Sequence, residues 1–284
     1  MDAFLVPAVD GLAYGLLLFV VAAGLALAFG VAQTLNLAHG TLYAVGAYAA
    51  ASLGDGGWPG LALALGAGTV AAAGLGGAIA LAVHPVAQRG LLTQALLTFG
   101  IALVGADLLT ARFGARDLPV TLPSTVDGSV HVLGHRYPAY RLGLVVVGLA
   151  LALALHLAVS HTRPGMLVRA LTDDRGMVAC LGFSPLAVRM AVLAVAGGLA
   201  GAAGVLGAPI IGPGPGVADT VLLLSLIVVV LGGLRRVPLI LVAALAVGEL
   251  QTLGVALLPA VAPFLLFAAM AVVLAARAVH WRPA

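Results

Sequence analysis

Long apolar runs, separated by short polar breaks, dominate the pattern of this 284-residue chain. Several runs reach about 18 residues, the length that predicts a membrane-spanning helix. They lack the alternation of β-barrel strands, and lipid leaves helices as the only other way to satisfy the backbone. We therefore predict an all-α integral membrane protein with about nine transmembrane helices, within a range of roughly eight to ten. The predicted segments are Gly11–Gly30, Ala38–Leu53, Leu61–Val83, Leu91–Arg112, Leu142–Ser160, Leu186–Ala208, Thr220–Leu234, Leu239–Leu258 and Ala262–Val279.

Two of these segments are short for a membrane crossing. Ala38–Leu53 is second among the first four segments, and Thr220–Leu234 is second among the last four. A fifth segment separates the quartets, so their topologies are opposite. Short segments at matching positions of inverted halves indicate a transport site near the midplane. The pattern therefore favours two inverted four-helix halves; the alternative is coincidence, since short helices also occur beside ordinary bends.

The sequence predicts one membrane domain with two long loops. Residues 11–113 form the first helical half, 114–141 an outer loop and 142–160 a linking helix. The inner loop, residues 161–189, is the most charged part of the chain, and residues 186–279 form the second helical half.

Arginine placement predicts the orientation, because cytoplasmic loops are enriched in Lys and Arg. The chain has no lysine, so all 13 strong cations are arginines. With residues 161–189 in the cytoplasm, most arginines lie inside. Nine crossings then put the N-terminus outside and the C-terminus in the cytoplasm; a re-entrant Ala38–Leu53 would leave eight crossings and move one end. The arginines left outside are Arg112, Arg116, Arg136 and Arg141.

Composition narrows the function classes further. The chain is 63% hydrophobic and 8% charged, and membrane topology explains its net charge of +3 without nucleic-acid binding. A single cysteine, Cys180, excludes an internal disulfide and a paired-cysteine metal site. The chain has no HExxH, GxSxG or GxxxxGK(S/T) motif. We therefore expect no enzymatic chemistry, no metal and no cofactor in this chain.

Glycine, with 38 residues, recurs inside the predicted helices. Gly197 and Gly201 form a GxxxG pair, and Gly66, Gly74 and Gly77 recur along the third segment. Small residues let helix backbones approach closely in lipid. We predict that most of these glycines serve tight packing.

The break between the first two segments contains the sequence NLAHG, Asn36 to Gly40. Polar groups at a broken helix must be satisfied inside protein, and a histidine there can cap freed N–H or carbonyl groups. In the structural interpretation, Asn36 and His39 complete the break. In the functional one, they line an inner gate together with Gly40.

Two acidic residues lie within apolar segments, where a charge is costly and normally faces the bundle interior or water. Asp107 lies toward the outer end of the fourth segment, where it can pair with Arg112 or Arg116 or stay solvated. Glu249 lies near the middle of the eighth, which contains no cation. Glu249 is our candidate for the translocation path, and a hydrogen bond that locks two helices together is the alternative.

Three stretches carry a resemblance to a known family. Residues 11–50 contain a glycine-rich first helix, NLAHG, and then the element Gly46-Ala47-Tyr48. Residues 168–206 contain a charged loop followed by a Gly/Ala-rich helix, and residues 229–238 read VVLGGLRRVP. In this order and spacing the stretches resemble the permease subunits of branched-chain amino-acid ABC importers, the LivH/LivM type.

The resemblance implies the fold of an ABC importer permease and a path for branched-chain amino acids or similar small polar solutes. It also implies a bacterial inner-membrane location, a second and related permease chain, two cytoplasmic ATPases that bind the ATP, and a periplasmic or extracellular binding protein. Related permeases carry urea or short amides, which is one alternative. A stand-alone proton-coupled transporter that uses Glu249 or Asp107 is another.

The resemblance further makes residues 161–189 an ATPase-coupling loop, and the local sequence predicts two short helices there. The first is Gly165–Leu171, and Thr172 begins a run of N-cap side chains for the second. Gly182 ends this second helix, and Ser184-Pro185 begins the next. A rigid helix would transmit ATPase closure, whereas a solvated connector would only keep positive charge inside. The candidate coupling residues are Arg169, Ala170, Asp173, Asp174, Val178, Ala179, Leu181 and Gly182.

Overall fold

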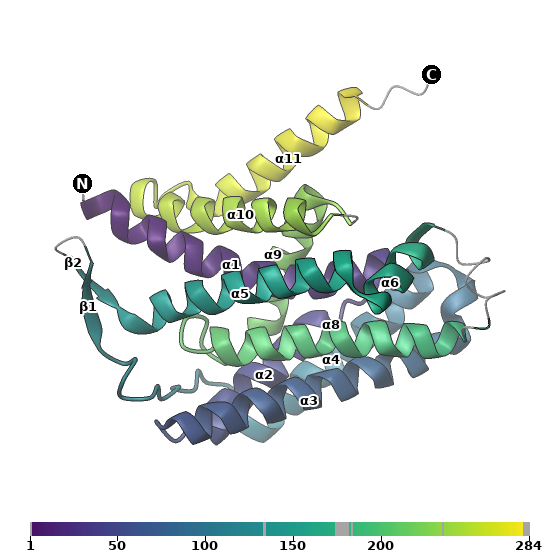
Figure 1. Ribbon diagram of the computed structural model, residues 1–284, viewed down its shortest axis with the longest axis horizontal. Helices are drawn as coiled ribbons and strands as arrows, with labels where there is room; N and C mark the ends of the chain where they lie inside the picture. Colours follow the sequence, from purple (N-terminus) through teal and green to yellow (C-terminus); the bar gives the residue numbers. More distant parts are fainter. Residues whose placement is uncertain (1, 133–134, 174–181, 183, 235, 281–284) are drawn as a thin grey trace.

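The computed structural model describes residues 2–132, 135–173, 182, 184–234 and 236–280. Within these residues, six helices are long and apolar enough to cross a membrane. They lie side by side along the long axis of the molecule (Figure 1). These six are α1 (Asp2–Gly30), α3 (Trp58–Val83), α4 (Leu91–Phe113), α5 (Ala139–His161), α8 (Pro185–Gly207) and α10 (Val237–Leu257).

Shorter helices complete the described fold. α2 (His39–Leu53), α9 (Val217–Gly232) and α11 (Ala262–His280) correspond to the three remaining predicted segments. α6 (Arg163–Asp173) and the 3-10 turn η1 (His84–Arg89) lie between longer helices. Each of the nine predicted apolar segments is therefore helical, with ends shifted by a few residues apart from α1, which begins at Asp2. The all-α membrane class is confirmed.

The predicted outer loop contains a small sheet that the sequence analysis missed. β1 (Ser129–Val132) pairs antiparallel with β2 (His135–Pro138), and α5 begins directly afterwards at Ala139. The Tyr137 hydroxyl donates to Asp10 Oδ1 at 2.5 Å, which fixes this hairpin to the start of α1. Burial and this bond raise the pKa of Tyr137, so its hydroxyl stays protonated.

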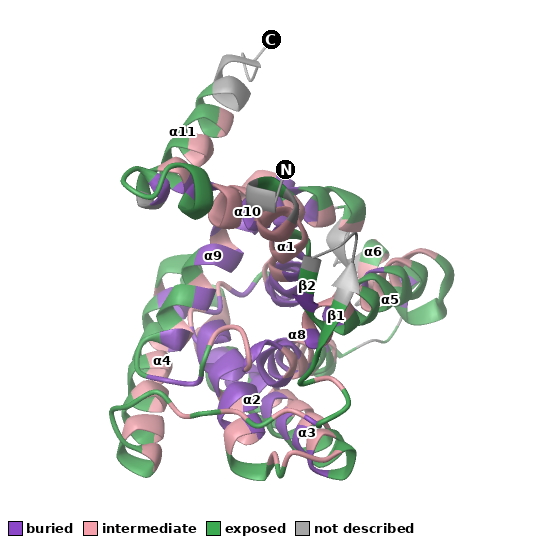
Figure 2. Ribbon diagram, turned by 90° about the vertical axis from the view of Figure 1, so that its left-hand side faces the viewer, coloured by how far each residue is buried: buried purple, intermediate pink, exposed green. Residues whose placement is uncertain are grey.

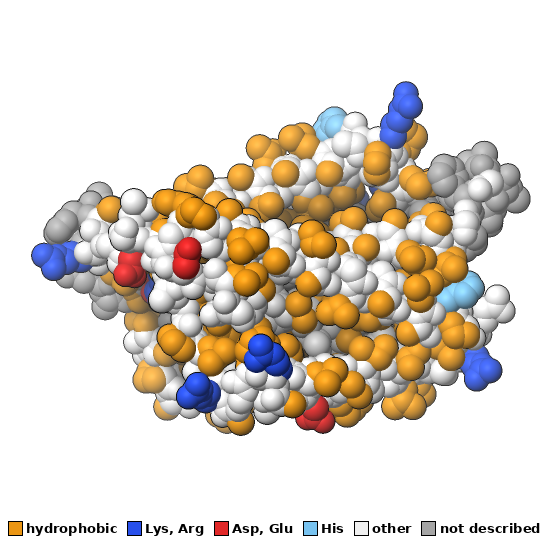
Figure 3. Space-filling view, turned by 90° about the horizontal axis from the view of Figure 1, so that it is seen from below, with side chains coloured by type: hydrophobic (Ala, Val, Ile, Leu, Met, Phe, Trp, Pro, Cys, Tyr) orange, Lys and Arg blue, Asp and Glu red, His pale blue; other side chains and the backbone are white. Residues whose placement is uncertain are grey.

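The two ends of the bundle differ. The hairpin and the start of α1 lie at one end, which we call the hairpin end (Figure 1). α6 and the end of α11 lie at the other, which we call the α6 end. Hydrophobic side chains are spread over the face drawn in Figure 3 and charged ones are few, as a lipid-facing surface requires.

Contacts repeat between the two halves. α3 packs on α8 as α10 packs on α1, and α2 packs on α8 as α9 packs on α1. α4 touches α2 as α11 touches α9. α1 and α8 are antiparallel, because Gly24 meets Ala196 while Leu17 meets Gly207. The equivalent helices thus run in opposite directions, as the inverted-repeat prediction requires.

Tight glycine contacts hold these helices together. A Cβ at Gly197 would collide with the Ala72 carbonyl, and one at Gly201 would collide with the Gly68 backbone, so the GxxxG pair packs α8 on α3 as predicted. The prediction is wrong for Gly66, Gly74 and Gly77, because a Cβ at each would meet nothing within 4 Å. These three glycines lie on the outer side of α3, where composition alone cannot distinguish them from buried ones.

Candidate translocation and coupling sites

The segment between α1 and α2, residues 31–38, turns back into the helix bundle. His39 Nε2 lies 3.0 Å from the carbonyl oxygen of Val21, in the middle of α1. At 1.5 Å per residue, Val21 is about 13 Å along the helix from Gly30, where α1 ends. α2 therefore begins inside the bundle and not at its α6 end, and it crosses only part of the membrane thickness.

Thr98 of α4 holds this re-entrant segment. Its hydroxyl accepts from the Leu37 N–H at 3.1 Å and lies 2.9 Å from the Leu35 carbonyl. Asn36 Oδ1 accepts from the Ala38 N–H at 3.1 Å. The side chains of Asn36 and His39 are 1% and 0% exposed, so they lie in the packed core and complete the break. The geometry supports the structural interpretation; a gating role for them stays a prediction.

Gly40 marks the place where the two short helices meet. A Cβ at Gly40 would collide with the Ala218 carbonyl in the first turn of α9. Neither helix start has a capping side chain: the N-cap residues are Ala38 and Gly216, the latter with φ +82°. The positive ends of two partial helices thus meet inside the bundle, which is the arrangement that carries substrate sites in inverted-repeat transporters.

Glu249 lies away from the place where α2 and α9 meet. A Cβ at Gly11 would be 2.7 Å from Glu249 Oε2 and 2.7 Å from Thr252 Oγ1, so Glu249 packs against α1 near the hairpin end. Gly11 and Val21 are about 15 Å apart along α1. The structure does not bring Glu249 together with His39. This contact packs α10 against α1, and both the helix-locking and the path role of Glu249 stay predictions.

Asp107 is exposed on α4, and within the described residues no ion pair joins it to Arg112 or Arg116. Arg112 instead lies over the Phe113 ring, 5.3 Å from its centroid. Sequence reasoning missed a further exposed acid within an apolar helix, Asp219 in the first turn of α9. Its position could have indicated it, because Asp219 directly precedes the short predicted segment Thr220–Leu234.

A cavity of about 600 Å³ opens at the α6 end, between the start of α4 and the end of α1. Its polar lining includes Gln33, Gln94 and Arg189. Gln94 is 3% exposed, its Nε2 donates to the Ala87 carbonyl at 3.0 Å, and its Oε1 has no partner in the described part of the chain. Sequence reasoning did not select these residues, since each is an isolated polar position on its own segment.

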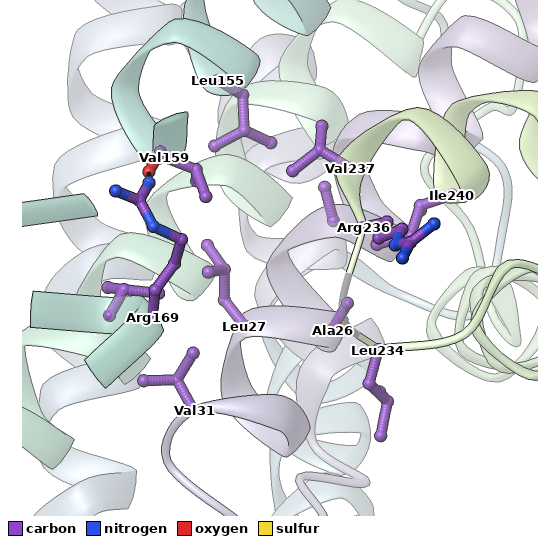
Figure 4. Close-up of a pocket in the computed structure, with 12 residues that line it drawn as sticks. Ala26, Leu27, Val31, Leu155, Val159, Arg169, Leu234, Arg236, Val237 and Ile240 are labelled. Atoms are coloured by element: carbon purple, nitrogen blue, oxygen red, sulfur yellow. Dashed lines mark hydrogen bonds between the residues drawn. The ribbon is translucent and has the colours of Figure 1, made fainter. Parts of the chain in front are cut away.

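α6 confirms the first predicted helix of the inner loop. The Gly165 N–H donates to Thr162 Oγ1 at 3.1 Å, and Gly165 lies directly against the Ala158 carbonyl at the end of α5. The Arg169 guanidinium donates to the Val159 carbonyl (Figure 4). These contacts fix α6 to α5.

α6 also borders a cavity of about 180 Å³ whose lining is mostly apolar. Leu27 of α1, Leu155 of α5 and Val237 of α10 line it, and Arg236 lies at its margin (Figure 4). α6 therefore contacts α5 and shares this cavity with α1 and α10.

The second predicted coupling helix falls on Asp174, Val178, Ala179 and Leu181, which lie outside the described residues. The predicted start of α8 is confirmed, whereas the helix that Gly182 was predicted to end lies outside the described residues. Gly182 has φ +87°, the left-handed conformation of a C-terminal stop. Ser184 Oγ then accepts from the Ala187 N–H at 3.4 Å, and Pro185 opens α8.

Several apolar helices, two partial helices that meet inside the bundle and a helix fixed across one end define a multi-pass membrane permease. The chain belongs to the family described as "Branched-chain amino acid transport system / permease component", whose model matches residues 8–275.

Two curated relatives share the name "High-affinity branched-chain amino acid transport system permease protein LivH". The protein from Escherichia coli K12 is 26% identical over 275 residues, which cover 90% of this chain and 87% of that protein. The protein from Salmonella typhimurium LT2 is 25% identical over 274 residues, with the same coverage. No solved structure matches the chain.

Proposed function

We propose that this chain is a membrane-spanning permease subunit of an ABC importer and forms a path for branched-chain amino acids. The match to the family over residues 8–275 carries the proposal. The meeting of α2 and α9 at Gly40 and Ala218 supports it, because partial helices that end at mid-depth suit a polar cargo.

The subunit works with others in this proposal. Two cytoplasmic ATPases bind and hydrolyse the ATP, a periplasmic or extracellular binding protein delivers the cargo, and a second, related permease chain completes the membrane part. The chain itself is not an enzyme and holds no cofactor. It lies in the bacterial inner membrane, with the α6 end in the cytoplasm.

α6 and the residues that follow it couple the ATPases to the path. Arg169 and Ala170 lie in a helix that is fixed to α5 and borders α1 and α10. Gly182→Val, or Val178→Asp with Leu181→Asp, should leave an inserted protein without substrate-stimulated ATP hydrolysis. Normal stimulation in both variants would show that the loop is only a connector.

Reconstitution in proteoliposomes tests the function itself. Uptake of labelled leucine should require ATP, the ATPases and the binding protein, and a proton gradient alone should not drive it. Uptake driven by the gradient alone would identify a secondary transporter. ATP-dependent uptake of urea or short amides without uptake of leucine would keep the ABC class and change the cargo.

A further inference from the structure

α4 and α9 flank the first turn of α2. Gly105 of α4 contacts Thr41, and Ala218 of α9 contacts the neighbouring Gly40. Viewed from the hairpin end, α4 and α9 lie along the same side of the molecule, with α11 beyond α9 (Figure 2). We call the exposed residues of α4 and α9 on this side the α4–α9 face. They include Leu96, Leu103 and Asp107 of α4 and Asp219, Thr220 and Leu223 of α9.

The two carboxylates of this face lie at a similar level along the bundle, below its hairpin end. Asp107 follows Gly105 by half a turn and Asp219 follows Ala218 directly, so both lie within about 5 Å of the depth of α2's first turn. By helix length, Asp107 is about 24 Å from the start of α4 and about 9 Å from its end. Neither group lies at the tip of the bundle, because Asp107 is about two turns before the end of α4 and Asp219 is level with it.

Exposure alone does not distinguish this face from one that lipid covers, whereas its acidic side chains do. α4 and α5 are buried to the same extent, since 17% of the residues in the apolar stretch of each helix are buried. The part of α5 between Leu142 and Ser160 carries no acidic side chain and no arginine, so lipid can cover it. Acidic side chains at this depth are costly against lipid and normally face protein or enclosed water. The α4–α9 face therefore needs a cover other than lipid.

A cavity with a polar lining lies at the α6 end of α4. The 600 Å³ cavity is bordered by Leu91 and Gln94 at the start of α4 and by Leu234 just after α9. Gln94 Oε1 and Thr41 Oγ1 are buried and have no hydrogen-bond partner among the described residues. Buried polar groups without a partner thus lie beside α4 at two levels, near its start and near Gly105.

We propose that the α4–α9 face is the surface that the second permease chain covers, with Asp107 and Asp219 facing water enclosed between the two chains. The proposal rests on the function given above, which supplies the second permease. It excludes the opposite side, formed by α3 and α5, as the contact between permeases.

Photo-crosslinking in native membranes tests this surface. Benzoylphenylalanine replaces Leu103 on α4 or Leu223 on α9, and the control replaces Leu149 on α5. Leu103 and Leu149 are 53% and 51% exposed, and each lies about 15 Å from the hairpin end of its helix. Positions 103 and 223 should give an adduct whose second chain is a permease by mass spectrometry, and position 149 should give none.

The other outcomes separate the surface from the function. A permease adduct at 149 and none at 103 or 223 would overturn the proposed surface while leaving paired permeases intact. If no position gives an adduct, the mass of the transporting complex decides: two permeases would overturn the surface, and one permease would overturn the pairing itself.

A second measurement tests the enclosed water. In a Cys180→Ser background, Asp107→Cys and Asp219→Cys should react with a small water-soluble thiol reagent in the assembled complex, whereas Leu149→Cys should not. If positions 107 and 219 are labelled no more than position 149, the placement of the two carboxylates is wrong.

Discussion

At the scale of single residues, glycine positions decide how closely the helices pack. A Cβ at Gly46 of α2 would be 2.9 Å from the Gly201 Cα and would collide with the Gly201 carbonyl. Gly46→Ala should therefore destabilise the protein by about 1–3 kcal/mol. Gly77→Ala is the control, because its Cβ meets nothing within 4 Å, and it should stabilise by roughly 0.5–1 kcal/mol. Thermal unfolding in detergent measures both, and equal effects would contradict the packing described.

Thr98 gives a second prediction at this scale, since its hydroxyl links α4 to both Leu35 and Leu37. Thr98→Val keeps the shape and leaves the half-buried Leu37 N–H without its acceptor, which should cost about 1–3 kcal/mol. Thr93→Val is the matched control, because Thr93 Oγ1 bonds only to Arg89 in the preceding turn. A stability loss of the same size in the control would show that the re-entrant segment does not depend on Thr98.

At the scale of elements, α6 is the part expected to move with the ATPases. Arg169 holds it to the end of α5 through the Val159 carbonyl. Arg169→Ala should reduce substrate-stimulated ATP hydrolysis severalfold, because α6 would then move without carrying α5. Arg163→Ala removes the same charge from an exposed position at the start of α6 and should retain stimulation. ATPase assays on the reconstituted complex with and without cargo-loaded binding protein measure the difference. A similar loss in both variants would point to charge and not to attachment.

At the scale of the whole molecule, the prediction concerns orientation. The start of α1 and the end of α11 lie at opposite ends of the bundle (Figure 1). Most arginines lie in loops that the sequence assigns to the α6 end, so this end should face the cytoplasm. A fluorescent reporter that folds only in the cytoplasm should be active when fused after Ala284 and inactive when fused before Met1. The reverse pattern, with both fusions expressed, would invert the whole assignment.

The order and type of the elements followed from the sequence alone. Apolar runs such as Gly11–Gly30 must become helices, since lipid leaves a backbone no other partner than its own carbonyls. The cap at Ser184 was equally local, because it depends on backbone conformation and neighbouring side chains. The family followed too, since NLAHG and the other motifs are read directly from the chain.

Tertiary structure decided which residues share a place. The depth of His39 depends on the 31–38 segment turning back to Thr98, a contact between positions far apart in the sequence. The separation of Glu249 from His39, and the common depth of Asp107 and Asp219, depend on how α1, α2, α4 and α9 pack. A hydrophobic pattern fixes only that a helix crosses the membrane. Which of its sides faces a neighbour is set by close backbone contacts such as Gly40 with Ala218, which exist only after the helices assemble.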